Sequence, residues 1–359
     1  MNYESGKYKN IHYGDILIKL PTLVDCNNIL LPFVNDNILV SPKLNLLKTG
    51  DIVIADTAED YTAGKAIEIK NKSSRVISGL HTISCRPNFE FYNGYLGYYL
   101  NSFTFRKNLL PLVQGIKVYS VSKYMYNFLF INYPSLMEQK KITNLLLNID
   151  ARIQTQNKII EDLNKLKKSL IDDKFTNAEF SVSLKEVLIE RKSYSEKGLE
   201  YEHVTLSKDG IIPKGERYDR DFLVTDESKE YKIKKLNDIC YNPANLKFGV
   251  ICLNNYKDSI FSPIYVTFEV DKKYNPYYVS LYLTSDRFIK KILKYQQGTV
   301  YERMSVNPDD FLKGRLPIIK NQESFISLIK TIDNKCTVEK ELLKTFEIQK
   351  AHLLKNMFI

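Results

Sequence analysis

The sequence has 359 residues, of which 44% are hydrophobic and 26% charged, and this composition excludes a disordered chain, a collagen and a small disulfide scaffold. The length predicts about two domains, and the formal net charge of +10 favours a polyanionic partner. No apolar run approaches the ~18 residues that a membrane span needs, so we expect no membrane association.

The N-terminus and the cysteines bear on the cellular compartment. Residues 1–5 have neither the basic head nor the apolar core of a secretory signal. The 5 cysteines are scattered and form no CxxC pair, which is typical of reduced thiols rather than of zinc ligands or disulfides. We therefore expect a cytoplasmic protein. The 25 tyrosines, with no tryptophan, suit either half-buried strands or contacts with phosphates and bases.

Residues 1–133 are predicted to form a globular unit of mixed strands and helices. The β-branched run at 51–55 is typical of a buried strand, and a helix-like segment follows near 94–110. Residues 176–316 are organised in the same way. Their β-branched and aromatic run lies at 264–268 and their helix-like segment near 276–294.

A long helix is predicted over residues 134–175, which contain no glycine and, after Pro134, no proline. Ser135 and Glu138 have the spacing of a capping box at its start. Apolar residues then recur with a period of seven, as in a coiled-coil seam. The two rows are Ile142, Ile149, Gln156, Leu163 and Leu170, and Leu146, Ile153, Ile160 and Lys167.

A second long helix is predicted at 317–359, where the same two rows recur. They are Phe325, Ile332, Glu339, Phe346 and Leu353, and Ile329, Cys336, Leu343 and Lys350. The polar breaks in the rows coincide at a shift of 183 residues, which matches Gln156 with Glu339. Matching breaks favour two helices that pair with each other over a single solvated helix.

The internal repeat extends beyond the helices. The matches at the same shift include Gln114-Gly115 with Gln297-Gly298, Phe105 with Phe288, Pro134 with Pro317, and Phe175 with Phe358. Upstream the shift changes to 187, where Asp51-Ile52 matches Asp238-Ile239. The C-terminal part of each unit is therefore the more similar, and the N-terminal part has diverged.

Antiparallel pairing of the full seams, 142–170 against 325–353, places Gln156 opposite Glu339 at the midpoint. A buried polar layer fixes the register of such a pair. We therefore expect an α+β fold of two mixed α/β globular domains, 1–133 and 176–316. They are separated by two long helices, 134–175 and 317–359, which pair as an antiparallel coiled coil in a pseudo-twofold repeat.

Catalytic motifs are absent or unconvincing. The sequence contains neither GxxxxGK[ST] nor GxGxxG, and its 4 histidines lack metal-ligand spacing. The Asn242-Pro243-Ala244-Asn245 loop resembles that of amino-methyltransferases without the aromatic residue that stacks a flipped base. Asp51 with Glu68-Ile69-Lys70 matches a nuclease metal pattern, and an alternating strand explains it equally well. We expect binding rather than catalysis, with no metal and no cofactor in this chain.

Two runs contain basic residues and no acidic residue, between Glu90 and Glu138 and between Asp286 and Glu302, and they overlap under the repeat. Such runs suit a surface that tracks phosphates, and solvated helix faces are the alternative. Reading bases requires side chains such as Arg, Lys, Asn and Gln. The candidate DNA-binding residues are Lys65, Arg106, Lys107, Gln114, Lys117, Lys123, Arg217, Lys247, Lys290, Lys291, Gln296, Gln297, Tyr301 and Arg303.

Two globular units, each followed by a long helix that opens with Pro-x-x-x-x-Gln, resemble the specificity (S) subunit of type I restriction–modification systems. The residues that carry the resemblance lie at 134–142, 149–153 and 163–170 and at Phe175. In the second unit, residues 241–249 resemble a segment common in one class of these recognition domains.

The resemblance implies a non-catalytic subunit that binds double-stranded DNA. Each globular unit would be a target recognition domain that reads one half of a split sequence. The helices would set the spacing of the half-sites and dock two modification methyltransferase subunits, which use S-adenosylmethionine. Separate restriction subunits, which combine translocase and nuclease, would use ATP.

The chain departs from the family pattern at two places. Residues 180–187 resemble the start of a recognition domain, whereas the first unit has no clear counterpart before 7–16, so we expect a first domain shortened at its N-terminus. The second helix has Asn321-Gln322 where the first has Glu138-Gln139. Two other function classes stay open: a coiled-coil adaptor that binds protein without DNA specificity, and a DNA-modifying enzyme with a degenerate site.

Overall fold

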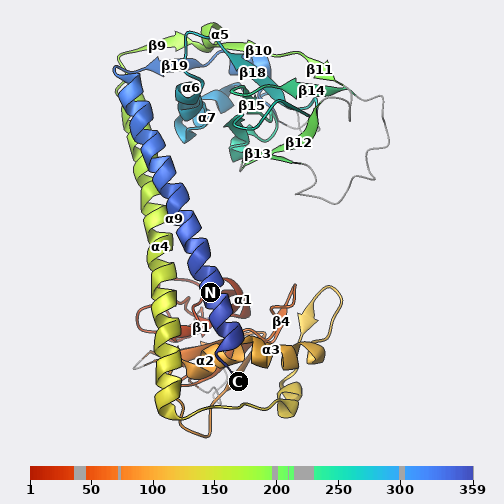
Figure 1. Cartoon of the computed structure of the whole chain (residues 1–359), viewed down its shortest axis with the longest axis vertical. Coiled ribbons are helices and arrows are strands. Elements are labelled where there is room, and N and C mark those ends of the chain that lie inside the picture. The colour runs from red at the N-terminus through yellow and green to blue at the C-terminus, as the bar shows by residue number, and fades with distance from the viewer. Residues whose placement is uncertain are drawn as a thin grey trace. The chain divides into compact units, whose positions relative to one another are not determined.

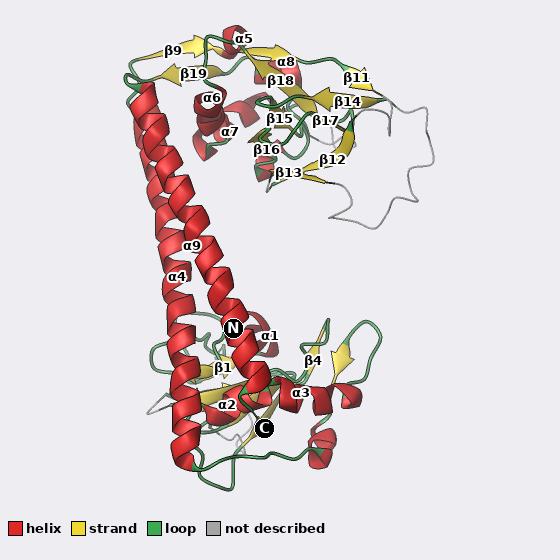
Figure 2. Cartoon of the chain, in the orientation of Figure 1, coloured by secondary structure: helices red, strands yellow, loops and turns green. Residues whose placement is uncertain are grey.

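The structure is a computed structural model that describes the whole chain except residues 36–45, 72–73, 196–200, 209, 214–229, 299–303 and 359. It divides into two compact units. Unit 1 comprises Met1–Ile159 and Glu339–Ile359, and unit 2 comprises Ile160–Val338. Each unit therefore contains part of both long helices. Helices and strands are mixed in both, as the sequence predicts (Figure 2).

Unit 1 is built on a four-stranded sheet whose strand order is β2-β5-β3-β7. Its strands are β2 (Leu23–Asp25), β5 (Ala66–Lys70), β3 (Ile52–Ala55) and β7 (Thr82–Cys85). All four residues of β3 are buried. Ile52 and Ile54 join one apolar cluster while Val53 and Ala55 join another, because successive side chains of a strand point to opposite faces. Both faces of this sheet are therefore covered.

The remaining elements of unit 1 cover or flank this sheet. Two short pairs are β1 (Lys9–Ile11) with β6 (Val76–Ser78) and β4 (Thr57–Ala58) with β8 (Tyr119–Ser120). The helices are α1 (Tyr13–Ile18), α2 (Tyr95–Leu100) and α3 (Phe103–Leu109), with 3-10 turns η1 (Leu110–Leu112) and η2 (Lys123–Phe128). The predicted helical segment near 94–110 is thus confirmed as α2 and α3.

Unit 2 contains a corresponding four-stranded sheet of order β10-β18-β15-β16. Its strands are β10 (Leu188–Glu190), β18 (Val266–Val270), β15 (Ile239–Tyr241) and β16 (Ile251–Leu253). A second sheet has the order β11-β14-β17-β12-β13. Its strands are β11 (Tyr194–Ser195), β14 (Tyr231–Lys234), β17 (Ser259–Phe261), β12 (Glu202–Ser207) and β13 (Gly210–Pro213).

Unit 2 contains short helices, two of which repeat α2 and α3 of unit 1. They are α5 (Leu184–Val187), α6 (Pro276–Leu283), α7 (Asp286–Ile292) and α8 (Pro308–Phe311), with 3-10 turns η5 (Leu246–Phe248) and η6 (Leu293–Tyr295). The Ser102 side chain caps α3 by accepting from the Phe105 amide, and Ser285 caps α7 by accepting from the Phe288 amide. The repeat found in the sequence therefore has the same local geometry in both units.

The two long helices are α4 (Leu136–Thr176) and α9 (Gln322–Asn356) (Figure 1). The predicted capping box is present, since the Glu138 amide donates to Ser135 Oγ at 3.4 Å. Helix α9 begins later than residue 317, because Pro317 and Ile318 belong to β19 (Arg315–Ile318). This strand pairs with β9 (Phe180–Ser183).

Within unit 1, α4 and α9 contact each other through polar side chains. Lys350 Nζ lies 2.6 Å from Asp150 Oδ1. Gln156 Nε2 lies 3.1 Å from the Glu339 carbonyl and also donates to the Glu339 carboxylate. Both Gln156 and Glu339 are buried, so the predicted contact between the two seam breaks is present.

Unit 2 contains the equivalent ion pair. Lys167 Nζ lies 2.5 Å from Asp333 Oδ1, and these residues match Lys350 and Asp150 under the repeat. A tyrosine hydroxyl donates to each aspartate at 2.7 Å, from Tyr277 to Asp333 in unit 2 and from Tyr98 to Asp150 in unit 1. A lysine, an aspartate and a tyrosine therefore join the long helices to a domain helix in both units, although Tyr98 and Tyr277 are not at equivalent positions of the repeat.

The C-terminal end of each long helix fills an aromatic site. In unit 2, Phe175 packs on Tyr278 and Tyr282 with ring centroids 5.5 and 5.0 Å away. In unit 1, the equivalent Phe358, which follows the end of α9, packs on Tyr95 and Tyr99 at 5.8 and 5.7 Å. Each phenylalanine is buried, so these contacts contribute to both apolar cores.

Candidate nucleic-acid interface

Two of the basic residues singled out in unit 1 are held by backbone carbonyls. Lys65 Nζ donates to the Leu17 carbonyl at 2.8 Å. Arg106 donates to the carbonyls of Ala63 and Tyr61. Burial lowers the pKa of both side chains, with nearby Lys350 adding to the effect at Lys65. Lys65 and Arg106 therefore stabilise the strand and turn at 61–66, and their contact with phosphates stays a prediction.

The other candidates of unit 1 are exposed. They are Lys107 on α3, Gln114 and Lys117 on the loop that precedes β8, and Lys123 on η2. All four come from the acid-free run and lie within a short stretch of chain, so a nucleic acid can reach them without displacing any element.

Gln114 begins a closed loop that has a counterpart in unit 2. Gln114 and Ser120 exchange backbone hydrogen bonds of 2.9 and 2.7 Å, and Gln297 and Ser305 do so at 2.9 and 2.8 Å. A glycine with positive φ follows each glutamine, with φ +131° at Gly115 and +157° at Gly298. A Cβ at Gly115 would lie 1.9 Å from the Val118 carbonyl oxygen, so this loop requires glycine.

Both glutamine side chains are exposed at the base of their loops. Glutamine can pair with adenine through two hydrogen bonds, which makes Gln114 and Gln297 equivalent candidates for reading a base. Gln296, the neighbour of Gln297, is half-buried. Arg217, Tyr301 and Arg303 lie outside the described residues.

A basic groove is present on unit 2, and we define it by Lys208, Lys247, Phe248 and Lys290. These residues line a cavity of about 890 Å³. Lys208 follows β12, Lys247 and Phe248 lie in η5, and Lys290 lies on α7. The tertiary fold therefore brings three distant segments to one surface.

Aromatic and charged groups are combined in this basic groove. Phe248 is 59% exposed, and Lys247 Nζ lies 4.9 Å from its ring centroid. The carboxylate of Asp286, also in the groove, is 2.5 Å from Lys168 Nζ, which holds the pKa of Asp286 below its usual value. With this carboxylate already paired, the lysines of the groove suit contact with a phosphate chain, and the exposed ring offers an apolar contact beside it.

Helix α7 extends the positive surface beyond the groove. Lys290, Lys291 and Lys294 are exposed on or directly after this helix. Partial burial, followed by the positive charges of Arg287 and Lys294, lowers the pKa of Lys291. A phosphate placed among these like charges would relieve their mutual repulsion.

The sequence did not single out Lys208 or Phe248. Lys208 and Lys247 are far apart in the sequence, and the tertiary fold, rather than a local pattern of residues, brings both to the groove. Phe248 lies beside Lys247 within the segment 241–249, so an exposed aromatic in a family-like segment is the signal that could have identified it.

The nuclease-like pattern has a structural role in unit 1. Glu68 is buried and accepts from the amides of Gly94 and Gly97, at 2.5 and 2.9 Å, and from Asn93 Nδ2. Asp51 forms two 2.7 Å hydrogen bonds with Arg86. The methyltransferase-like loop is also structural, because Asn242 Oδ1 accepts from the Ala244 and Asn245 amides. Among the described residues, no cluster of three or more His, Cys, Asp or Glu could hold a metal.

Replacing Glu68 tests this structural role. Glu68→Ala leaves two buried amides and the partly buried Asn93 side chain without their acceptor, and we expect the free energy of unfolding of unit 1 to fall by about 2–4 kcal/mol. Glu68→Gln keeps one acceptor oxygen and should cost less. Urea denaturation followed by circular dichroism measures both, with the exposed Glu59→Ala as control. A loss below about 0.5 kcal/mol for Glu68→Ala would contradict the assignment.

The chain was compared with protein families, curated proteins and solved structures. No protein-family model matches the chain. It is 23% identical over 338 residues to the "Putative type I restriction enzyme MjaX specificity subunit" of Methanocaldococcus jannaschii, covering 85% of this chain and 76% of that protein. No helix in the described part of the chain is long and apolar enough to cross a membrane.

Solved structures share the fold. The S subunit of a type I restriction–modification system from M. genitalium has a TM-score of 0.53 at 14% identity, covering all of this chain and 90% of its own. A chain solved in work on complex assembly and conformational transition of the type I R-M system has a TM-score of 0.55 at 15% identity, covering 88% of this chain and 83% of its own. The resemblance predicted from the sequence is therefore confirmed: in sequence and in fold, this chain is similar to the specificity subunits of type I restriction–modification systems.

Proposed function

We propose that this chain is the DNA sequence-recognition subunit of a type I restriction–modification complex, and that it reads a bipartite target with one domain per half-site. The observation that carries the proposal is the closed Gln-Gly loop at equivalent positions of the two units, each with exposed basic residues nearby. Similarity to a type I specificity subunit over most of the chain supports it. One recognition surface per unit suits a target with two halves.

We further propose that α4 and α9 pair as an antiparallel coiled coil and dock two methyltransferase subunits. In unit 1, Asp150 of α4 contacts Lys350 of α9, and Gln156 of α4 contacts Glu339 of α9. The residue numbers increase along α4 and decrease along α9, which is the order of an antiparallel pair. In unit 2, Lys167 contacts Asp333. A helix pair with polar layers fixes register, and a fixed register would set the spacing of the half-sites.

In this proposal the chain is not catalytic and carries no cofactor. The methyltransferase subunits would supply S-adenosylmethionine, and the restriction subunits would supply ATP-driven translocation and cleavage. Its target, double-stranded cellular and invading DNA, places the complex in the cytoplasm.

Methylome sequencing of a host with and without this chain tests the proposal. A bipartite methylated motif should disappear with the chain, and exchanging residues 1–133 for another recognition domain should change one half of that motif only. Change of both halves together would refute one domain per half-site. Binding without a steep dependence on salt would favour the protein-binding adaptor, and methyl transfer by the purified chain alone would favour a DNA-modifying enzyme.

The register of the helix pair can be tested at Gln156 and Glu339. Cysteines at both positions should crosslink within one chain under mild oxidation, because the two side chains are in contact. Changing both residues to Leu should keep the chain folded and broaden the distribution of distances between spin labels on α4 and α9, since the polar layer that penalises slipped pairings is lost. A folded double-cysteine variant that does not crosslink would contradict the pairing.

A further inference from the structure

Within the described residues, one edge of the sheet in unit 1 has no partner strand, whereas the equivalent edge in unit 2 is paired. In unit 2, β10 pairs with the outer edge of β18, with Glu190 opposite Phe268 and Leu188 opposite Val270. In unit 1, β7 is the equivalent of β18, because each is the later in the chain of the two strands that pair antiparallel with β3 or β15. Strand β7 is the last strand of its sheet, so in the described residues its outer edge has no partner.

The segment that covers unit 2 is a strand, a helical turn and a strand: β9, α5 and β10. Leu184, Val187 and Leu188 of this segment are at most 2% exposed and belong to the main apolar cluster. Its backbone is tied to the rest of the unit, since β9 pairs with β19 and the Leu184 amide donates to the Gly314 carbonyl at 3.0 Å. The segment thus supplies both apolar side chains and strand pairing.

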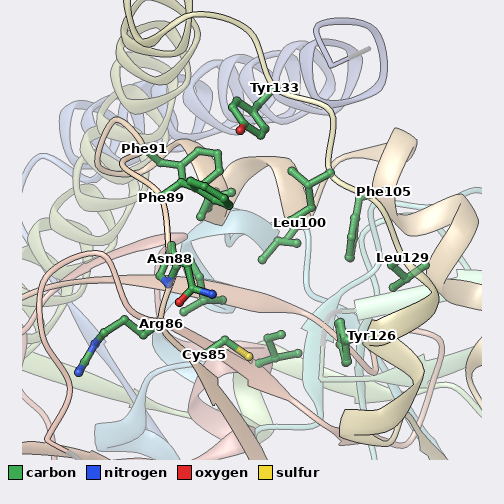
Figure 3. A pocket seen from close by; sticks show the side chains of 15 residues that line it. Cys85, Arg86, Asn88, Phe89, Phe91, Leu100, Phe105, Tyr126, Leu129 and Tyr133 are labelled. Carbon is green, nitrogen blue, oxygen red and sulfur yellow. The ribbon is translucent and has the colours of Figure 1, made fainter.

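Unit 1 contains two adjoining cavities in the place of this segment. The first, of about 440 Å³, is lined mostly by apolar side chains, among them Ile52, Leu100, Phe105, Ile131 and Tyr133. Figure 3 shows Phe91, Leu100 and Phe105 around it, with Tyr133 at one end and Cys85 at the other, while the Arg86 side chain points away. The second, of about 450 Å³, shares Tyr133 with the first and continues to Pro134.

Under the repeat, residues that line these cavities in unit 1 correspond to residues of unit 2 that the segment 180–190 covers. At the shift of 183, Tyr133 and Pro134 correspond to Leu316 and Pro317, which pair with Val182 and Ser181 of β9. The exposures differ accordingly. Tyr133 is 50% exposed and Leu316 is 0% exposed. Phe128 is 55% exposed, whereas its equivalent Phe311 is 0% exposed. Together the two cavities follow the path that residues 180–190 take in unit 2.

We propose that this apolar groove of unit 1 binds a partner polypeptide that presents a strand–turn–strand segment with the apolar pattern of residues 180–190. The segment would place apolar side chains against Leu100, Phe105 and Tyr133 and add a strand to the free edge of β7. Exposed contiguous apolar surface of this kind marks a protein-binding site. The groove goes beyond the proposed DNA surface and shares no residue with it.

A difference in ion pairing between the units predicts that the partner segment does not need an arginine equivalent to Arg191. In unit 2, Arg191, which follows β10, forms an ion pair with Asp238 at 2.8 Å. In unit 1, Asp51 is the equivalent of Asp238 and is already paired with Arg86 of its own unit. The partner therefore requires the apolar residues of the segment but not the arginine.

Cys85 provides a direct probe, because it is exposed, lines the groove and lies on β7. A synthetic peptide with the sequence of residues 180–192 should slow alkylation of Cys85 in the full chain at least tenfold at saturation, measured by mass spectrometry. The peptide with Arg191→Ala should protect equally well. The peptide with Leu184→Asp and Val187→Asp should not protect.

Two variants of the chain and a measurement of its oligomeric state provide further tests of the groove. Phe89→Ser, in the groove, should weaken binding of the peptide at least tenfold, whereas Ile18→Asp, at an exposed apolar residue outside the groove, should leave binding unchanged. Full alkylation of Cys85 at any concentration of the native peptide would overturn the proposal. Concentration-dependent dimerisation that itself protects Cys85 would also overturn it, by assigning the groove to a second copy of the chain. DNA binding, measured separately, does not depend on either outcome.

Discussion

Replacing Lys208, Lys247 and Lys290 together by Ala should weaken DNA binding by about 30- to 100-fold near 0.1 M salt and reduce the salt slope by about three units. Each lysine that neutralises a phosphate releases counterions, and all three line the basic groove of unit 2. The loss should be similar for DNA with and without the target motif, because phosphate contacts position a duplex without reading it.

A matched triple variant controls for net charge. Lys185, Lys272 and Lys273 are exposed on unit 2 outside the groove, and their replacement by Ala removes the same charge. Fluorescence anisotropy of a labelled duplex over a salt series measures both variants. Equal losses in the two would assign the effect to overall charge and remove the groove from the DNA surface. A further change, Gln297→Ala, should reduce discrimination between target and non-target DNA more than affinity.

Truncating the phenylalanine at the end of each long helix should destabilise one unit only. Phe358→Ala removes a buried ring from between Tyr95 and Tyr99, and we expect the free energy of unfolding of unit 1 to fall by about 3–5 kcal/mol. Phe175→Ala should have the same effect on unit 2, because its ring contacts Tyr278 and Tyr282.

Hydrogen exchange read by mass spectrometry separates the two effects. Phe358→Ala should reduce protection of α2, and Phe175→Ala should reduce protection of α6, since these helices carry the tyrosines in contact. Phe130→Ala, at a residue that is 85% exposed, should leave both unchanged. Unaltered protection of α2 in Phe358→Ala would contradict the role assigned to the C-terminal end of α9.

The long helices were predictable because their signals are local. A capping box, the absence of glycine and proline and a seven-residue period depend on neighbouring residues only, and they located α4 within one or two residues. The start of α9 was less accurate. Residues 317–318 contain a proline and an isoleucine that suit either element, and their pairing with Ser181 and Phe180 decides for a strand.

The internal repeat predicted contacts between distant residues, which the pattern of either helix alone could not predict. Matching Gln156 with Glu339 predicted which polar side chains meet, and they do so in unit 1. The same shift aligned the two Gln-Gly loops before their backbone bridges were known. Symmetry within one chain thus replaces part of the tertiary information that a single sequence ordinarily lacks.

Individual binding residues were harder to predict from the sequence, because the charge of a residue does not show which way its side chain points. Lys65 and Arg106 resemble the other basic residues of unit 1 in sequence, yet in the structure they donate hydrogen bonds to the carbonyls of Leu17, Ala63 and Tyr61. Lys208 was overlooked for the opposite reason, since its neighbours in the groove are distant in the chain. Both outcomes depend on strand pairing between residues far apart in sequence.

The sequence by itself determined the two-unit organisation, the long helices and the contact of Gln156 with Glu339, because periodicity and repetition are properties of residue order. Only the tertiary structure decided which lysines form a groove, and that β18 is paired on its outer edge while β7 has no such partner among the residues that the structure describes. Burial and edge exposure arise from contacts between segments that fold together from distant positions, and no local pattern of residues encodes them.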